Sequence, residues 1–292
     1  MKSSLHNNPA EPAWNEYTPD QRHRETLLKG WQRTTGNLFR ARSLIWQLFK
    51  RDFLTTYRKS FFGLSWLALA PLLGILSWIV MNKAGILQPG ATVIPYPAYV
   101  LIGITFWGLF MGAYTGTAAT LTTAQSYIFQ VNYPHEILPV KQMMEQAVSF
   151  LITYIINVII LLCCGIHLSW GLLAAPFLAL PLLLLGAAIG LIVSVIGIAV
   201  FEIKRAVETV LGFLLFLTPV LFAPPEPGTL IGSCIRWNPV GHLIVAARDM
   251  LITGALSQPW QYAIAAGIAL ISFFIAMRMF SISESIIIEK MI

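Results

Sequence analysis

The chain alternates between long apolar stretches and short polar segments, a pattern typical of helices that cross a membrane. A bilayer core about 30 Å thick requires about 20 apolar residues per helix. Apolar runs of that length cover 61–82, 96–118 and 260–277, and the run 146–201, which contains no Asp, Glu, Lys or Arg, has room for two spans. The shorter run 209–223 is expected to form one more. The pattern therefore predicts six transmembrane helices.

The composition agrees with this interpretation and excludes an ordinary soluble protein. Hydrophobic residues make up 57% of the 292 residues and charged residues only 11%, whereas about a quarter of a soluble domain is charged. Cys163 and Cys164, two of the three cysteines, are adjacent within an apolar run and cannot form a disulfide framework. The expected fold class is all-α, in a polytopic integral membrane protein.

The positions of the basic residues predict the orientation. In a six-span arrangement, 16 of the 19 Lys and Arg residues fall on one side, and only Lys83, Arg236 and Arg248 fall on the other. Cytoplasmic segments are enriched in Lys and Arg. Both termini are therefore expected in the cytoplasm, with the protein in the cytoplasmic (inner) membrane of the cell.

The region before the first span divides into two parts. Residues 1–36 are polar and are expected to form a cytoplasmic tail without stable structure. In 37–60, apolar and basic residues lie largely on different faces at helical spacing, which predicts an amphipathic helix in the membrane interface. Its Arg51 and Arg58 are candidates for binding lipid phosphate, although bulk anionic lipid would use the same cations. Residues 61–280 would form the six-span domain, and 281–292 a cytoplasmic C-terminal tail.

The segment 228–254, before the last span, has an unusual pattern. Two semi-apolar pieces, each too short to cross a bilayer, are separated by Asn238 and Pro239. A re-entrant helical hairpin on the external side fits this pattern, and an external amphipathic loop is the alternative. Arg248 and Asp249 lie in the second piece, where they would lock an external gate or stabilise a loop by an ion pair.

The sequence offers little catalytic chemistry. It lacks the Gly-x-x-x-x-Gly-Lys-Ser/Thr motif that cradles nucleotide phosphates. The six predicted spans contain no ionisable Asp, Glu, Lys or Arg of the kind that ion-coupled carriers use at membrane depth. We therefore expect no enzymatic activity, no metal site and no cofactor in this chain. If the protein transports a substrate, another subunit is expected to supply the energy.

Four groups of residues, in this order, carry a resemblance to a known family. They are Arg51-Asp52 with 57–63; Tyr99, Gly103 and Phe106-Trp107; 132–139; and Thr218-Pro219-Val220 with Trp237-Asn238-Pro239 and Ala247-Arg248-Asp249. With the six-span layout, they resemble the membrane subunit of ABC-2-type polysaccharide exporters, the permeases for O-antigen, capsular polysaccharide and teichoic acid.

The resemblance implies a homodimer bound to two cytoplasmic ATP-binding cassette subunits, which would hold ATP and Mg²⁺. It implies a lipid-linked polysaccharide as substrate and membrane lipids as further partners, with no nucleic acid. An exporter of drugs or lipids with the same fold, a membrane glycan or lipid transferase, and a membrane scaffold are the alternatives.

The resemblance also assigns a coupling segment that contacts the ATPase. It consists of Asn132, Tyr133, Pro134, His135, Glu136, Ile137, Leu138 and Pro139. Tyr133 stands where the family has Phe, and His135 where it has Arg. The alternative is a capped helix start that leads into the third span.

Aromatic residues in the second span suggest a path for sugars. Phe106, Trp107, Phe110 and Tyr114 are channel-lining candidates, because aromatic faces stack on sugar C–H bonds and these side chains share faces at helical spacing. Packing between helices, or an interfacial aromatic belt, is the alternative.

Overall fold

The computed structural model describes residues 27–58, 65–86, 90, 92–121, 135–197, 199–200, 202–223 and 230–291. In this part of the chain every regular element is helical. The elements are α2 (Leu27–Arg40), α3 (Arg42–Arg58), α4 (Trp66–Lys83), α5 (Tyr96–Ala118), α7 (Ile137–Cys163), η2 (Trp170–Leu173), α8 (Ala175–Leu178), α9 (Leu180–Ile196), α10 (Ile203–Leu214), η3 (Leu215–Leu217), α11 (Leu230–Trp237), α12 (Pro239–Thr253) and α13 (Pro259–Met291).

Four helical segments are long and apolar enough to cross a membrane. They are Tyr96–Ala118, Ile137–Cys163, Ala175–Ile196 and Pro259–Ser283. The apolar part of α4, Leu72–Lys83, is shorter, and α10 has only 12 residues. The all-helical prediction is therefore confirmed, and four of the predicted spans correspond to helical segments that are long and apolar enough to cross a membrane.

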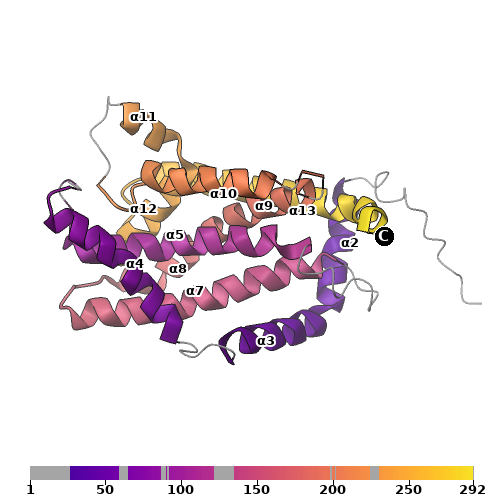
Figure 1. Ribbon diagram of the computed structural model, residues 1–292, viewed down its shortest axis with the longest axis horizontal. Coiled ribbons are helices and arrows are strands. Elements are labelled where there is room, and N and C mark those ends of the chain that lie inside the picture. The colour runs from indigo at the N-terminus through magenta and orange to yellow at the C-terminus, as the bar shows by residue number, and fades with distance from the viewer. Residues whose placement is uncertain are drawn as a thin grey trace, which may run out of the picture.

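The long helices form a bundle whose two ends differ (Figure 1). One end, here called the α2 end, contains α2 and the C-terminal part of α13, and the opposite end, the α12 end, contains α11 and α12. Contacts between distant residues show the direction of two of the helices. Tyr99 of α5 lies beside α12, and Ser281 of α13 lies beside the start of α7. Helices α5 and α13 therefore both run towards the α2 end.

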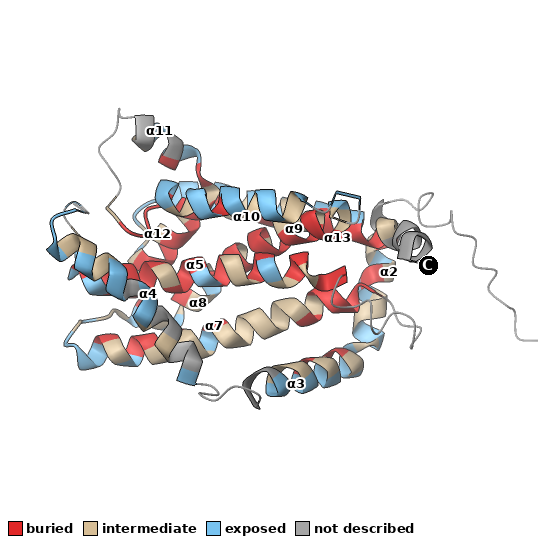
Figure 2. Cartoon of the chain, in the orientation of Figure 1, coloured by how far each residue is buried: buried red, intermediate tan, exposed pale blue. Residues whose placement is uncertain are grey.

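The centre of the bundle is the α5–α9 pair, where glycine allows close contact. A Cβ atom on Gly186 would lie 2.3 Å from the carbonyl oxygen of Phe110, and one on Gly190 would lie 2.4 Å from that of Tyr114. Small residues of this kind let helix backbones approach in membranes. In Figure 2, burial is concentrated on α5, α9 and α12, whereas α3 and α10 carry many exposed residues.

The N-terminal helical region is longer than predicted and is divided. Helix α2 begins at Leu27, inside the tail expected to lack structure, and the single helix predicted over 37–60 is interrupted at Ala41. Ile45 and Phe49 are buried on one face of α3, as the apolar spacing predicted, and α3 packs along α7.

The two short helices predicted before the last span are present as α11 and α12. Asn238 separates them, and α12 ends at Thr253, just before Gly254, whose φ of 75° is left-handed and favours glycine.

Candidate functional site

At the α12 end, a buried arginine joins three parts of the chain. Arg248 of α12 is only 3% exposed, and its Nη1 donates a hydrogen bond to the carbonyl of Pro219 at 2.9 Å. Its Cζ lies 3.9 Å from the centre of the Tyr99 ring, a cation–π contact. The Tyr99 hydroxyl in turn donates to the carbonyl of Phe222 at 2.9 Å. Helix α12, the start of α5 and the turn after η3 are therefore fixed to one another.

Asn238 adds a second connection to the same turn. Its side-chain oxygen accepts hydrogen bonds from the backbone N–H groups of Val240 and Gly241, which caps α12. Its Nδ2 donates to the Thr218 hydroxyl at 2.8 Å. Pro239 occupies the first turn of α12, where its missing N–H costs no hydrogen bond. One residue thus both starts α12 and holds it to the turn.

Two of the four predicted gate residues, Asn238 and Arg248, bind the same turn. The side chain of Asp249 accepts a hydrogen bond from the Ser257 hydroxyl, whereas Arg248 binds Pro219 and Tyr99. The side chains of these two neighbouring residues therefore contact different groups, as is usual for adjacent helix positions. Asn238, Arg248 and the turn residues Thr218 and Pro219 meet at one place, which we call the α12 cap.

At the α2 end, the described part of the predicted coupling segment, residues 135–139, points into the protein. Glu136 is 2% exposed, and its Oε1 accepts a hydrogen bond from the Ser281 hydroxyl of α13 at 2.9 Å. Ile137 is fully buried, and His135, Leu138 and Pro139 are buried too. This part of the segment is therefore attached to α13. Asn132, Tyr133 and Pro134 lie outside the described residues.

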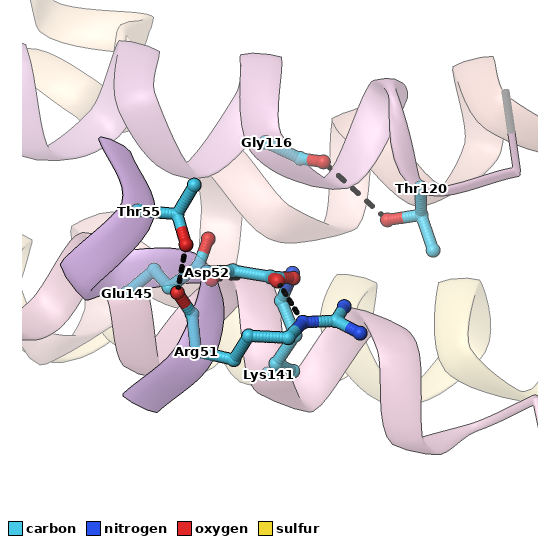
Figure 3. A network of polar contacts seen from close by, with 7 residues as sticks. All are labelled: Arg51, Asp52, Thr55, Gly116, Thr120, Lys141 and Glu145. Carbon is cyan, nitrogen blue, oxygen red and sulfur yellow. Dashed lines mark hydrogen bonds and ion pairs between the residues drawn. The ribbon is translucent and has the colours of Figure 1, made fainter. Parts of the chain in front are cut away.

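Beside this segment, a chain of charges connects α3 to α7, as Figure 3 shows. Nζ of Lys141 lies 2.7 Å from Oδ2 of Asp52 and 3.1 Å from Oε1 of Glu145. Nε of Arg51 lies 2.7 Å from Oδ1 of Asp52. Burial alone would raise the pKa of Asp52, but the hydrogen bonds and charges of Arg51 and Lys141 outweigh it and hold that pKa below its ordinary value.

These contacts bear on the predicted lipid-phosphate residues. Arg51 is about half exposed and pairs with its neighbour Asp52, so one edge of its guanidinium is already used. The side chain of Arg58 lies outside the described residues. The sequence identified the basic face of α3 but not Asp52 as its anchor, because the partner, Lys141, is distant in the chain.

The four channel-lining candidates lie in the packed core of the chain. Phe106, Phe110 and Tyr114 are fully buried, and Trp107 is 9% exposed. The Phe106 ring lies 5.8 Å from that of Phe150, and Trp107 lies 5.3 Å from Phe110. We therefore assign these aromatic residues to helix packing, the alternative interpretation given above, rather than to a wet surface of this chain.

A polar cleft of ≈ 210 Å³ opens between α3, α5 and α7. It lies along the face of α5 that carries small residues, opposite the face that carries the four aromatic residues. From α7 it is lined by Gln142, Glu145, Gln146 and Ser149. From α5 and α3 it is lined by Gly112, Thr115, Gly116 and Phe53. Sequence reasoning missed this cleft because it began the third span at residue 146, whereas α7 begins at Ile137. The four polar residues of α7 that line the cleft are spaced i, i+3, i+4 and i+7, and this spacing was the sequence signal for a polar helix face.

Comparison with known proteins decides which family this architecture resembles. The O-antigen export system permease protein RfbA of Myxococcus xanthus is 23% identical over 65% of this chain and 72% of its own length. The protein of the same name from Klebsiella pneumoniae is 22% identical over 71% of this chain and 79% of its own length. The polysialic acid transport protein KpsM of Escherichia coli is 22% identical over 81% of this chain and 92% of its own length.

The chain is a distant homologue of the ABC-2-type polysaccharide export permeases. No family model matches it. These permease homologues are named as permease and transport proteins, not as enzymes. Similarity to them and the four long apolar helices identify the chain as a multi-pass membrane protein. Among the described residues, no three His, Cys, Asp or Glu side chains lie together as a metal site.

Proposed function

We propose that this chain is the permease subunit of an ATP-driven ABC exporter that moves a lipid-linked polysaccharide across the cytoplasmic membrane. The observation that carries the proposal is the similarity to a polysialic acid transport protein over 81% of this chain and 92% of that protein. The convergence of the sequence pieces at the α12 cap supports it, because residues far apart in sequence meet in one buried structure. O-antigen, capsule or a related glycan is the proposed cargo.

The proposed membrane arrangement has six spans: α4, α5, α7, α9, α10 with η3, and α13. The α2 end would face the cytoplasm, since α2 and the C-terminal part of α13 lie there and most of the basic residues precede residue 60 in the sequence. Helices α11 and α12 would then form the re-entrant pair on the external side. The α12 cap supports this role, because non-helical backbone at membrane depth must be covered by protein and its turn carbonyls are paired with Arg248, Tyr99 and Asn238.

On the cytoplasmic side, we propose that the segment 132–139 transmits movement from an ATPase subunit. The chain would form a homodimer with two such subunits, which bind ATP and Mg²⁺. Glu136 supports the transmission step, since its hydrogen bond to Ser281 attaches the start of α7 to α13. A push on this segment would then move two spans together. The Asp52–Lys141 pair would carry the interfacial helix α3 with them.

The experiment that tests this function is purification of the tagged full-length protein from its native host in mild detergent. We expect an ATP-binding cassette protein to co-purify in a stoichiometric amount and to hydrolyse ATP. A folded, monodisperse protein that co-purifies with no ATPase would contradict the proposal and favour a transferase or a scaffold.

A further inference from the structure

The polar cleft between α3, α5 and α7 lies where a membrane protein ordinarily packs apolar side chains. At 1.5 Å per residue, Glu145 lies about 12 Å and Ser149 about 18 Å along α7 from Ile137. The cleft therefore extends from the charged boundary at Lys141 into a helix that is apolar enough to span a membrane. Polar groups at such depth are costly and commonly mark a substrate path.

The space exists because α5 presents glycine there. A Cβ atom on Gly112 would lie 2.3 Å from the amide of Gln146, so any larger residue would displace that side chain. At Gly116 a Cβ would lie 3.6 Å from Oε1 of Gln142, an ordinary contact. The Nε2 of Gln146 donates to the Gly108 carbonyl at 3.2 Å, which holds it against the glycine face. One side of the cleft is therefore the exposed backbone of α5 at its glycines, and the other side is the polar face of α7.

The lining chemistry selects a particular kind of ligand. Two amides and two hydroxyls, from Ser149 and Thr115, both donate and accept hydrogen bonds, and Glu145 accepts them. Phe53 adds an aromatic surface at the edge of the cleft. Amides, a carboxylate and an aromatic ring together suit a group with many hydroxyls and C–H faces.

The charges argue against a phosphate in this cleft. Lys141 pairs with both Asp52 and Glu145, at 2.7 Å and 3.1 Å, and Arg51 pairs with Asp52, so the two cations and two carboxylates balance and this network carries no net positive charge. An anion would be repelled by Glu145, whereas a neutral hydroxyl would donate to it. The volume of ≈ 210 Å³ is smaller than a drug-sized site of about 300–1,000 Å³, so it suits one small ring rather than a chain.

We propose that this cleft is a binding site for a neutral, polyhydroxylated group, namely a sugar unit of the exported glycan, held at the cytoplasmic side of one subunit. This inference rests on the proposed function. The same hydroxyl chemistry occurs in the glycerol head group of phosphatidylglycerol, but its phosphate would lie close to Glu145.

The test uses Thr115→Cys, which places a thiol of similar size on the exposed cleft wall. Its reaction with a small water-soluble thiol reagent is measured by peptide mass spectrometry in membrane vesicles of the native host. We expect slower reaction in vesicles from cells that make the glycan than in vesicles from cells that cannot. Trp46→Cys, on the exposed face of α3, is the control and should react equally in both.

Two further variants separate binding from structure. Gly116→Leu fills the cleft and should abolish the glycan-dependent protection, whereas Gly74→Leu, which enters open space on α4, should keep it. Glu145→Gln should weaken the protection about tenfold, since a hydrogen bond to a charged group is lost. Purified Thr115→Cys protein in phosphatidylcholine vesicles should react as fast with phosphatidylglycerol added as without it.

Equal reaction rates with and without the glycan, or protection by phosphatidylglycerol alone, would overturn the inference. Export of the glycan by the unmodified protein is measured in the same cells. If export proceeds and Thr115→Cys is never protected, only the cleft assignment fails. If the unmodified protein does not support export, the proposed function itself fails.

Discussion

The Cζ atom of Arg248 lies 3.9 Å from the centre of the Tyr99 ring, and the same guanidinium donates a hydrogen bond to the carbonyl of Pro219. This pairing brings a helix from the last third of the chain onto the start of α5. It makes the α12 cap depend on one buried cation that is held by a backbone carbonyl and an aromatic ring. The cap is therefore sensitive to the shape of the residue at 248 as well as to its charge.

Replacing Arg248 with Ala should destabilise the folded protein by about 3 kcal/mol. The change removes a charge-assisted hydrogen bond and a cation–π contact in a desolvated place. Chemical unfolding in detergent measures the free energy. Arg236→Ala, at an exposed position on α11, is the matched control and should change it by less than about 0.5 kcal/mol. Equal effects at the two positions would contradict the importance of the cap.

The contact between α5 and the turn after η3 makes a second prediction. A Cβ on Gly103 would lie 2.7 Å from the backbone carbonyl of Val220, which cannot move without breaking the cap. Gly103→Ala should therefore destabilise the protein by about 2 kcal/mol. Gly108→Ala, on the same helix with no atom within 4 Å of its Cβ, should stabilise it by about 0.5 kcal/mol. Thermal unfolding of both variants tests this, and a stable Gly103→Ala protein would contradict the close approach.

The Asp52–Lys141 pair predicts a pH dependence with a defined sign. The pKa of Asp52 is lowered in the folded protein from an ordinary value of 3.8, so its contribution is complete above pH 3.8 and is lost as the pH falls through the folded pKa. Asp52→Asn should cost about 1 kcal/mol between pH 5 and 8, since the pair is partly exposed. The difference in unfolding free energy between the two proteins should shrink in still more acidic buffer. A difference that stays the same in strongly acidic buffer would contradict this assignment.

Glu136 gives a prediction about coupling, which depends on the proposed function. Glu136→Ala removes the acceptor for Ser281 and should lower export roughly tenfold while the ATPase subunit stays bound. Glu136→Gln keeps an acceptor oxygen and should retain most of the export. Surface glycan and co-purified ATPase are measured in the same cells. Wild-type export from Glu136→Ala would show that the link to α13 carries no coupling.

Much of the fold could be predicted because apolar runs and proline positions act locally. The order of residues along the chain directly predicts the long helical segments Ala175–Ile196 and Pro259–Ser283. It also predicts the break at Asn238 between α11 and α12. The start of α7 could not be placed this way. Lys141 and Glu145 argue against a membrane helix by composition, and their pairing with each other and with Asp52 offsets the cost of burying Lys141.

The candidate site was harder to predict because helical spacing shows which residues share a face but not what that face meets. The spacing of Phe106 and Phe110 fits residues that line a channel as well as residues that pack against another helix. In the structure both side chains are packed and fully buried. The glycine positions carried the missing information. Gly186 and Gly190 mark the side of α9 that meets the aromatic face of α5, whereas Gly112 and Gly116 mark the open side.

The central claim is that this protein exports a polysaccharide, and the most direct measurement is the location of the glycan after the gene is deleted from its native host. Glycan outside the cytoplasmic membrane is compared with glycan inside it, before and after the gene is restored. The account predicts loss of the external glycan and accumulation of the lipid-linked glycan inside, both reversed by the restored gene. Unchanged external glycan in the deletion strain would contradict it.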